Sequence, residues 1–76
     1  MKALLELIAR SLVDNPEDVE VTRAGDDDEI VYELRVAAED LGKVIGKQGR
    51  TARAIRTLVA TAAKKLDQRV VFEIVE

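Results

Sequence analysis

The feature that most constrains the fold is a pair of glycines three residues apart, Gly46 and Gly49, which separates two helical patterns. Glycine has no Cβ, so both positions can adopt backbone angles closed to other residues and let another chain come close. Lys47 and Gln48 between them form an exposed polar tip. Arg50 begins the next helix, whose free N–H groups and positive dipole end attract an anion. The stretch is therefore expected to hold a phosphate chain.

Helices are expected on both sides of the glycines. Residues 38–45 predict a short helix that ends at the first glycine, with Glu39 and Asp40 in its first turn, where acids complement the helix dipole. Residues 50 to about 66 predict a longer helix, and its alanines, together with Gly42, would let the two helices cross closely. The expected buried stripe of the long helix is Ala52, Ile55, Val59, Ala62 or Ala63, and Leu66, with Leu58 alongside.

The rest of the chain predicts one helix and three strands. Residues 2–13 have apolar side chains at helical spacing, and the helix stops before Pro16 because the residue before a proline is pushed out of the helical region. Residues 19–23, 29–37 and 69–75 alternate apolar and polar side chains, which is typical of strands. The order is α-β-β-α-α-β, with the direction of the third strand left open. The expected buried stripe of the first helix is Leu4, Leu5, Ile8, Leu12 and Val13.

The turn between the first two strands, residues 24–28, has an acidic tip, which is consistent with an antiparallel hairpin. Four consecutive acids, Asp26 to Glu29, offer the oxygen ligands that Ca²⁺ and Mg²⁺ prefer. Their spacing does not match the alternate-residue ligands and turn glycine of an EF-hand loop. A solvated hairpin tip is the preferred interpretation, and no metal or cofactor is expected.

The distribution of charge matters more than its sum. A net charge of −3 argues against a nucleic-acid binder, because phosphate contacts dominate such affinity. Residues 1–40, however, carry a net charge of −8, and residues 41–76 carry +5. Between residues 41 and 66 there is no acid, and this basic stretch is what a strand of RNA requires. A solvated helix face is the alternative, but the neighbouring glycine loop favours RNA. The basic residues are Lys43, Lys47, Arg50, Arg53, Arg56, Lys64 and Lys65.

Length and composition exclude several classes of protein. A chain of 76 residues is expected to form one domain, residues 1–76, with a small core. Because it has no cysteine and no histidine, it lacks disulfides, thiol nucleophiles, the usual general bases and transition-metal ligands. We expect neither an enzyme nor a small-molecule substrate. No apolar run approaches the roughly 20 residues of a membrane span, so a cytoplasmic protein without membrane contact is expected.

The residues Ile45-Gly46-Lys47-Gln48-Gly49 resemble the GxxG loop of the KH domain, a module that clamps about four nucleotides of a single strand. The element order is similar over the whole chain to the α+β type II KH fold, in which three helices pack on one face of a three-stranded sheet. A closer resemblance, from Asp14-Asn15-Pro16 through Leu41-Gly42-Lys43-Val44-Ile45-Gly46-Lys47-Gln48-Gly49-Arg50 to the last strand, is to the small bacterial single-KH family KhpA.

Resemblance to that family implies a cytoplasmic RNA-binding protein that acts as an RNA chaperone. It also implies a complex with a larger KH-containing partner, KhpB, and a part in cell elongation and peptidoglycan homeostasis. Composition and spacing imply none of these cellular roles.

The hypothesis for the site is a cleft that holds a few unpaired nucleotides of RNA. The glycine loop would approach the sugar-phosphate backbone, cations would neutralise phosphates, and bases would lie over an apolar floor, Val44 or Ile45, towards a sheet edge. Each of these residues has a structural role as the alternative: Val44 and Ile45 as partly buried core residues, Gly42 in packing, Gly46 as a helix C-cap and Gly49 as a turn residue. The predicted RNA-binding residues are Lys43, Val44, Ile45, Gly46, Lys47, Gln48, Gly49, Arg50 and Arg53.

Aromatic side chains set a limit on affinity. The chain has one tyrosine, one phenylalanine and no tryptophan, and Tyr32 and Phe72 both fall on core-facing strand positions. Without a stacking platform, binding by one domain should be weak and salt-dependent, and a homodimer or a heteromer would raise it. The alternative is a protein-interaction module that docks another protein or its own copy through the same loop, which the overall acidity favours.

Overall fold

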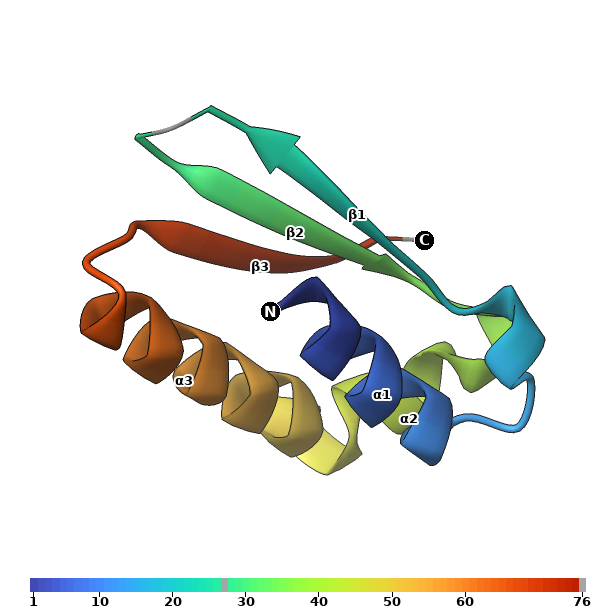
Figure 1. Cartoon of the computed structure of the whole chain (residues 1–76). Coiled ribbons are helices and arrows are strands. Elements are labelled where there is room, and N and C mark those ends of the chain that lie inside the picture. The colour runs from blue at the N-terminus through green and yellow to red at the C-terminus, as the bar shows by residue number, and fades with distance from the viewer. Residues whose placement is uncertain (27, 76) are drawn as a thin grey trace.

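A computed structural model of the chain describes residues 1–26 and 28–75. Its helices all lie on one face of a three-stranded sheet, and the other face is open (Figure 1). The order α-β-β-α-α-β and the α+β architecture expected from the sequence are confirmed. The elements are α1 (Lys2–Leu12), β1 (Glu20–Gly25), β2 (Ile30–Arg35), α2 (Leu41–Ile45), α3 (Arg50–Lys65) and β3 (Val70–Val75), with short 3₁₀ turns at Pro16–Asp18, Ala38–Asp40 and Lys47–Gly49.

The sheet has the order β1-β2-β3. β1 and β2 form the expected antiparallel hairpin, in register from Glu20 opposite Arg35 to Gly25 opposite Ile30. β3 runs parallel to β2, with Val70 opposite Ile30, because the chain returns through α2 and α3 before it enters the sheet again. The direction of the third strand is thus parallel, and β3 is an edge strand that packs beside α3 (Figure 1).

The core lies between the sheet and the three helices. The alternation predicted for the second strand is confirmed: Ile30, Tyr32 and Leu34 are buried, whereas Val31 and Glu33 on the other face are half-buried. Both aromatic side chains are inside, as expected. The buried apolar cluster is Leu5, Ala9, Val19, Val21, Ile30, Tyr32, Leu34, Val36, Val44, Ile55, Val59 and Phe72.

The buried stripe of α1 differs from the prediction. Leu5 and Ala9, one helical turn apart, are the buried residues, with Ile8 packed against the core beside them. Leu4 and Leu12 are 49% and 38% exposed, so the prediction that they are core residues is wrong. The reason is geometric: α1 turns only a narrow stripe towards the core, and the side chains that flank this stripe stay in contact with solvent.

Two leucines of the α3 region are also outside the core, contrary to expectation. Leu66 is 60% exposed because α3 ends at Lys65, and Ala63 is the last buried residue of the helix. Leu58 is 58% exposed on the outer face of α3. Gly42 is exposed, and a Cβ at that position would meet nothing within 4 Å, so close helix packing does not require this glycine.

The hairpin tip is organised by one of its own acids. The Oδ1 atom of Asp26 accepts hydrogen bonds from the backbone N–H groups of Asp28 (2.9 Å) and Glu29 (3.1 Å), which is an Asx-type turn. Asp27, the remaining acid of the predicted tip, lies outside the described residues. Over residues 1–26 and 28–75, no three acidic side chains converge as they would around a metal ion. Within the same ranges, no helix is long and apolar enough to cross a membrane.

Candidate nucleic-acid interface

The glycine loop joins α2 to α3 through one tight turn. Gly46 ends α2, and its N–H donates to the carbonyl of Gly42 at 2.8 Å. Gly49 N–H then donates to the carbonyl of Gly46 at 3.1 Å, which closes the 3₁₀ turn over Lys47 and Gln48. Lys47 and Gln48 are exposed at the tip, as predicted, and α3 starts immediately afterwards.

Three of the four residues of this turn have a positive φ. Gly46 has φ +78° and ψ 172°, Gln48 has φ +58°, and Gly49 has φ +74° and ψ 13°. The first pair of angles belongs to a region that is essentially restricted to glycine, and the other two are left-handed angles that glycine and asparagine tolerate best. An ideal Cβ on Gly46 would also lie only 2.9 Å from the backbone nitrogen of Thr51, whereas Gly49 has open space around it. The backbone at Gly49 can therefore be approached by a ligand.

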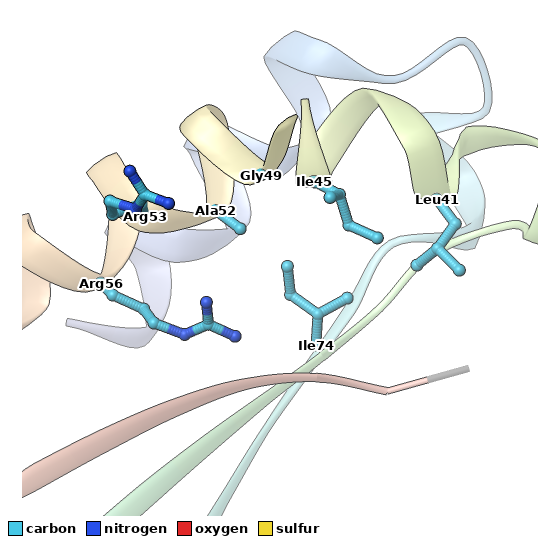
Figure 2. A pocket seen from close by; sticks show the side chains of 7 residues that line it. All are labelled: Leu41, Ile45, Gly49, Ala52, Arg53, Arg56 and Ile74. Atoms are coloured by element: carbon cyan, nitrogen blue, oxygen red, sulfur yellow. The ribbon is translucent and has the colours of Figure 1, made fainter. Parts of the chain in front are cut away.

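A groove runs between this loop, the start of α3 and the β3 edge of the sheet. Its volume is about 350 Å³, and its floor consists of apolar side chains from α2, α3 and β3 (Figure 2). Ile74 comes from β3, so the groove exists only because β3 packs against the helices that carry the loop. The residues that line it are Leu41, Ile45, Gly49, Ala52, Arg53, Arg56 and Ile74.

Four cations stand along the loop and the first turns of α3: Lys47, Arg50, Arg53 and Arg56. All four are exposed, and none has a carboxylate partner within the described ranges. Arg50 Nη2 donates to Gln48 Oε1 at 3.2 Å, which keeps its guanidinium next to the loop tip. Charges without partners are available to phosphate oxygens, and the positive end of the α3 dipole lies in the same place.

Lys43, one of the predicted RNA-binding residues, forms an ion pair in this structure. Its Nζ contacts the carboxylate of Asp14, and it lies 4.0 Å from Oδ1 of Asp40. The hydrogen bond to Asp14 raises the pKa of Lys43, and the nearby carboxylates of Asp40 and Glu39 add to this effect. Lys43 is therefore charged but already paired, so a phosphate would have to compete with Asp14 for it.

Asp40 fastens the start of α2 to the end of α1. Its side chain is 1% exposed and accepts hydrogen bonds from the N–H of Asp14 (3.3 Å), the N–H of Asn15 (3.0 Å) and Nδ2 of Asn15 (2.9 Å). Burial alone would raise the pKa of Asp40, but these hydrogen bonds and the charge of Lys43 together hold it below its usual value. The sequence predicts only a helix-dipole role for this acid, and the structure adds a buried carboxylate that holds α2 in place.

Only one residue of the predicted apolar floor reaches the groove. Val44 lies on the inner side of α2, is completely buried and has no surface to offer a base. The prediction that it contacts RNA is therefore corrected: its role is packing in the core. Ile45 lines the groove. The difference between Val44 and Ile45 follows from helix geometry, because neighbouring side chains on a helix point about 100° apart and cannot both face the same groove.

Comparison with known proteins gives a single answer. The family model described as the KH domain of KhpA and KhpB matches residues 2–74. The chain belongs to the KhpA/KhpB KH-domain family. The resemblance inferred from the glycine loop is thereby confirmed. No solved structure gives a significant match.

Three bacterial KhpA proteins show how far the similarity extends. The "RNA-binding protein KhpA" of Clostridium perfringens is 57% identical over 75 residues, which cover 99% of this chain and 100% of the relative. The protein of the same name in Aquifex aeolicus is 50% identical over 76 residues, covering 100% of this chain and 96% of the relative. That of Listeria monocytogenes is 49% identical over 76 residues and both full lengths.

In this KhpA-family chain, four residues of the groove lie outside the predicted site: Leu41, Ala52, Arg56 and Ile74. Arg56 belongs to the basic stretch, and its spacing of three from Arg53 places both on the same side of α3. That spacing is the signal that could have identified it. No sequence signal identified Ile74, because the sequence did not reveal which strand lies beside α3.

Proposed function

We propose that this chain is an RNA-binding protein that holds a short single-stranded segment in the groove between the glycine loop and β3. The observation that carries the proposal is the arrangement of the groove: exposed cations and an accessible loop backbone on one side, an apolar floor, and a strand edge on the other. The names of the three relatives, each called an RNA-binding protein, support it.

The proposed role of each residue follows from its position in the loop or the groove. Lys47, Arg50 and Arg53 neutralise phosphates, and the backbone of the loop approaches the strand at Gly49, where no side chain intervenes. Bases lie on the apolar floor at Ile45. Lys43 contributes only if phosphate displaces Asp14. Because Tyr32 and Phe72 are buried, no aromatic stacking adds to affinity, and one domain binds weakly.

Membership of the family extends the proposal to the cell. We propose a bacterial cytoplasmic RNA chaperone that works as a homodimer or together with a larger KhpB-type KH protein. In that role it would act in post-transcriptional regulation linked to cell elongation and peptidoglycan homeostasis. The family description, which names KhpA and KhpB together, supports the partner. A second RNA-binding surface in one complex would also offset weak binding through effective concentration.

One observation favours the alternative, a protein-interaction module with little RNA binding of its own. The outer face of α3 has a shallow hollow bordered by Arg50, Arg53, Ala54, Thr57 and Leu58. Leu58 is a large exposed apolar side chain beside two of the proposed phosphate-binding arginines. A protein docked on this face would therefore lie next to the RNA groove.

The test compares two matched double variants. Lys47→Asp with Gln48→Asp places negative charge at the loop tip and leaves both glycines intact. The control, Lys64→Asp with Gln68→Asp, makes the same chemical changes at the far end of α3, where both side chains are exposed. Circular dichroism shows whether each is folded, and fluorescence anisotropy measures binding of an unstructured hexanucleotide RNA at low and moderate salt.

We expect the loop variant to lose binding and the control to bind within a few-fold of the wild type. Equal binding by all three proteins would rule out the loop as the RNA site. If the wild type binds no RNA but forms a concentration-dependent dimer in light scattering, and Leu58→Asp abolishes that dimer, the interaction module is the correct function.

A further inference from the structure

We infer that Arg56 contacts the base, not the phosphate, of a nucleotide held in the groove, and that it favours a base with two adjacent hydrogen-bond acceptors, guanine or cytosine. The inference rests on the proposed function and adds a base preference to it.

The position of Arg56 differs from that of the other cations. Figure 2 shows its guanidinium extending from α3 towards Ile74 on β3, across the groove, whereas that of Arg53 points away from the strand. Arg53 also borders the hollow on the outer face of α3, so it stands on the rim between two surfaces. Arg56 belongs to the groove side.

Distance from the loop separates Arg56 from the phosphate contacts. It follows Gly49 by seven residues along α3, which at the helical rise corresponds to roughly 10 Å. An RNA strand whose phosphates meet the loop tip would direct its bases over the floor towards β3, where this guanidinium lies. The outer edge of β3 has no strand partner within the described residues, so its backbone groups are also free to meet a base edge.

Among residues 1–26 and 28–75, the guanidinium of Arg56 has no competing partner. It makes no ion pair and no side-chain hydrogen bond within the ranges that the structure describes. The groove that it enters is lined by the apolar side chains of Leu41, Ile45, Ala52 and Ile74. A polar base edge that enters the groove thus finds arginine N–H donors as its nearest side-chain partners.

The chemistry of the donor selects the base. A guanidinium has five N–H donors and no acceptor, so a bidentate contact requires two neighbouring acceptors. Guanine presents O6 and N7, and cytosine presents O2 and N3. Adenine places an amino donor next to N7, and the two carbonyls of uracil are separated by an N–H donor. Adenine and uracil would therefore set a donor against a donor.

The experiment uses four hexanucleotide RNAs: six uridines, and the same strand with one adenosine, cytidine or guanosine at the third position. A single substitution lets the strand slide until the preferred base lies in the groove. Anisotropy titrations are made with the wild type, Arg56→Gln and the matched control Arg53→Gln, which removes the same charge one turn earlier on the same helix.

We expect the wild type to bind the guanosine strand or the cytidine strand at least about fivefold more tightly than the adenosine strand and the strand of six uridines. Whichever of the first two binds more tightly shows which acceptor pair the guanidinium uses. Arg56→Gln should remove that difference, so that the variant binds all four strands with similar affinity. Arg53→Gln should weaken all four strands alike and keep the preference.

Equal binding of all four strands by the wild type would overturn the inference and leave the proposed function intact. A preference that survives in Arg56→Gln, or is lost equally in Arg53→Gln, would also overturn the inference. Failure of the wild type to bind any strand would instead refute the proposed function, and the inference with it.

Discussion

The two glycines of the loop have different requirements although they are only three residues apart. Gly46 combines a positive φ with an extended ψ and lies against Thr51, so both its conformation and its surroundings exclude a side chain. Gly49 has left-handed helical angles and open space, which a residue such as asparagine can adopt at modest cost. The loop therefore depends on Gly46 for its shape, and Gly49 leaves its backbone open to approach.

Replacing each glycine by asparagine tests this difference. Gly49→Asn should cost about 1 kcal/mol of unfolding free energy or less and keep most RNA binding. Gly46→Asn should cost about 2–3 kcal/mol, or distort the loop, and abolish binding. Urea denaturation measures the unfolding free energy of each variant, and fluorescence anisotropy measures its RNA binding. Equal effects of the two variants would show that the surroundings of Gly46 impose no special requirement.

Asp40 predicts a pH dependence of stability. Its pKa in the folded chain is lowered, so the ionised carboxylate adds stability above the pKa of the unfolded chain, and this contribution is lost as pH falls through the folded-state value. Asp40→Asn should lower the melting temperature at pH 7, by roughly 10 °C, because the backbone N–H groups of Asp14 and Asn15 lose a charged acceptor. Below about pH 4 the difference from the wild type should shrink. Thermal denaturation followed by circular dichroism from pH 2.5 to 7 checks both, and a constant difference would contradict the assignment.

At the scale of elements, α3 serves two surfaces. Its inner face packs Ala52, Ile55 and Val59 against the sheet, while its N-terminal turns present arginines to the groove. Because α2 is only five residues long, it cannot be stable alone and depends on α3 and on the Asp40 contacts for its place. The loop between the two helices is thus positioned by packing on both sides.

Two truncations on α3 distinguish its faces. Ile55→Ala removes a buried side chain and should cost about 2–4 kcal/mol of unfolding free energy. Leu58→Ala, on the exposed face, should change stability by less than about 0.5 kcal/mol. Urea denaturation of dilute protein gives both values. A large loss for Leu58→Ala that grows with protein concentration would mean that this face is covered in a dimer.

At the scale of the molecule, the acidic hairpin tip is kept apart from the cations of the glycine loop, although Lys64 and Arg69 lie beside the tip. The acidic hairpin tip lies at the end of the sheet near the C-terminus of α3, and the glycine loop lies at the opposite end of that helix (Figure 1). A chain with a net charge of −3 can therefore present a positive surface to RNA. This distance between tip and loop makes the proposed RNA binding compatible with the overall acidity of the chain.

The salt dependence of RNA binding follows from the same arrangement. If Lys47, Arg50 and Arg53 each neutralise one phosphate, the logarithm of the binding constant should fall against that of salt concentration with a slope of about −2. Lys47→Gln should make the slope shallower by about 0.7. Titrations between 50 and 200 mM salt, with anisotropy as the readout, are sufficient. A slope near zero would show that counterion release contributes nothing to the affinity.

The sequence by itself determined the parts of this protein that depend on local chemistry. The spacing of Gly46 and Gly49 predicted the loop, the alternation of residues 30–36 predicted the buried face of a strand, and the order of the six elements followed from such periodicities. Each of these signals lies within a few residues of the feature that it predicts, because backbone conformation and side-chain direction are set locally.

Only the tertiary structure decided which side chains meet across long separations in the chain. The parallel direction of β3 places Ile74 opposite Arg56, and the end of α1 brings Asp14 to Lys43, 29 residues later. Burial was decided in the same way: neighbouring elements cover Val44, whereas Leu58 is left exposed on the outer face of α3. A helical period shows that one face is apolar, but which of its side chains are covered depends on the neighbouring elements, and that requires the whole fold.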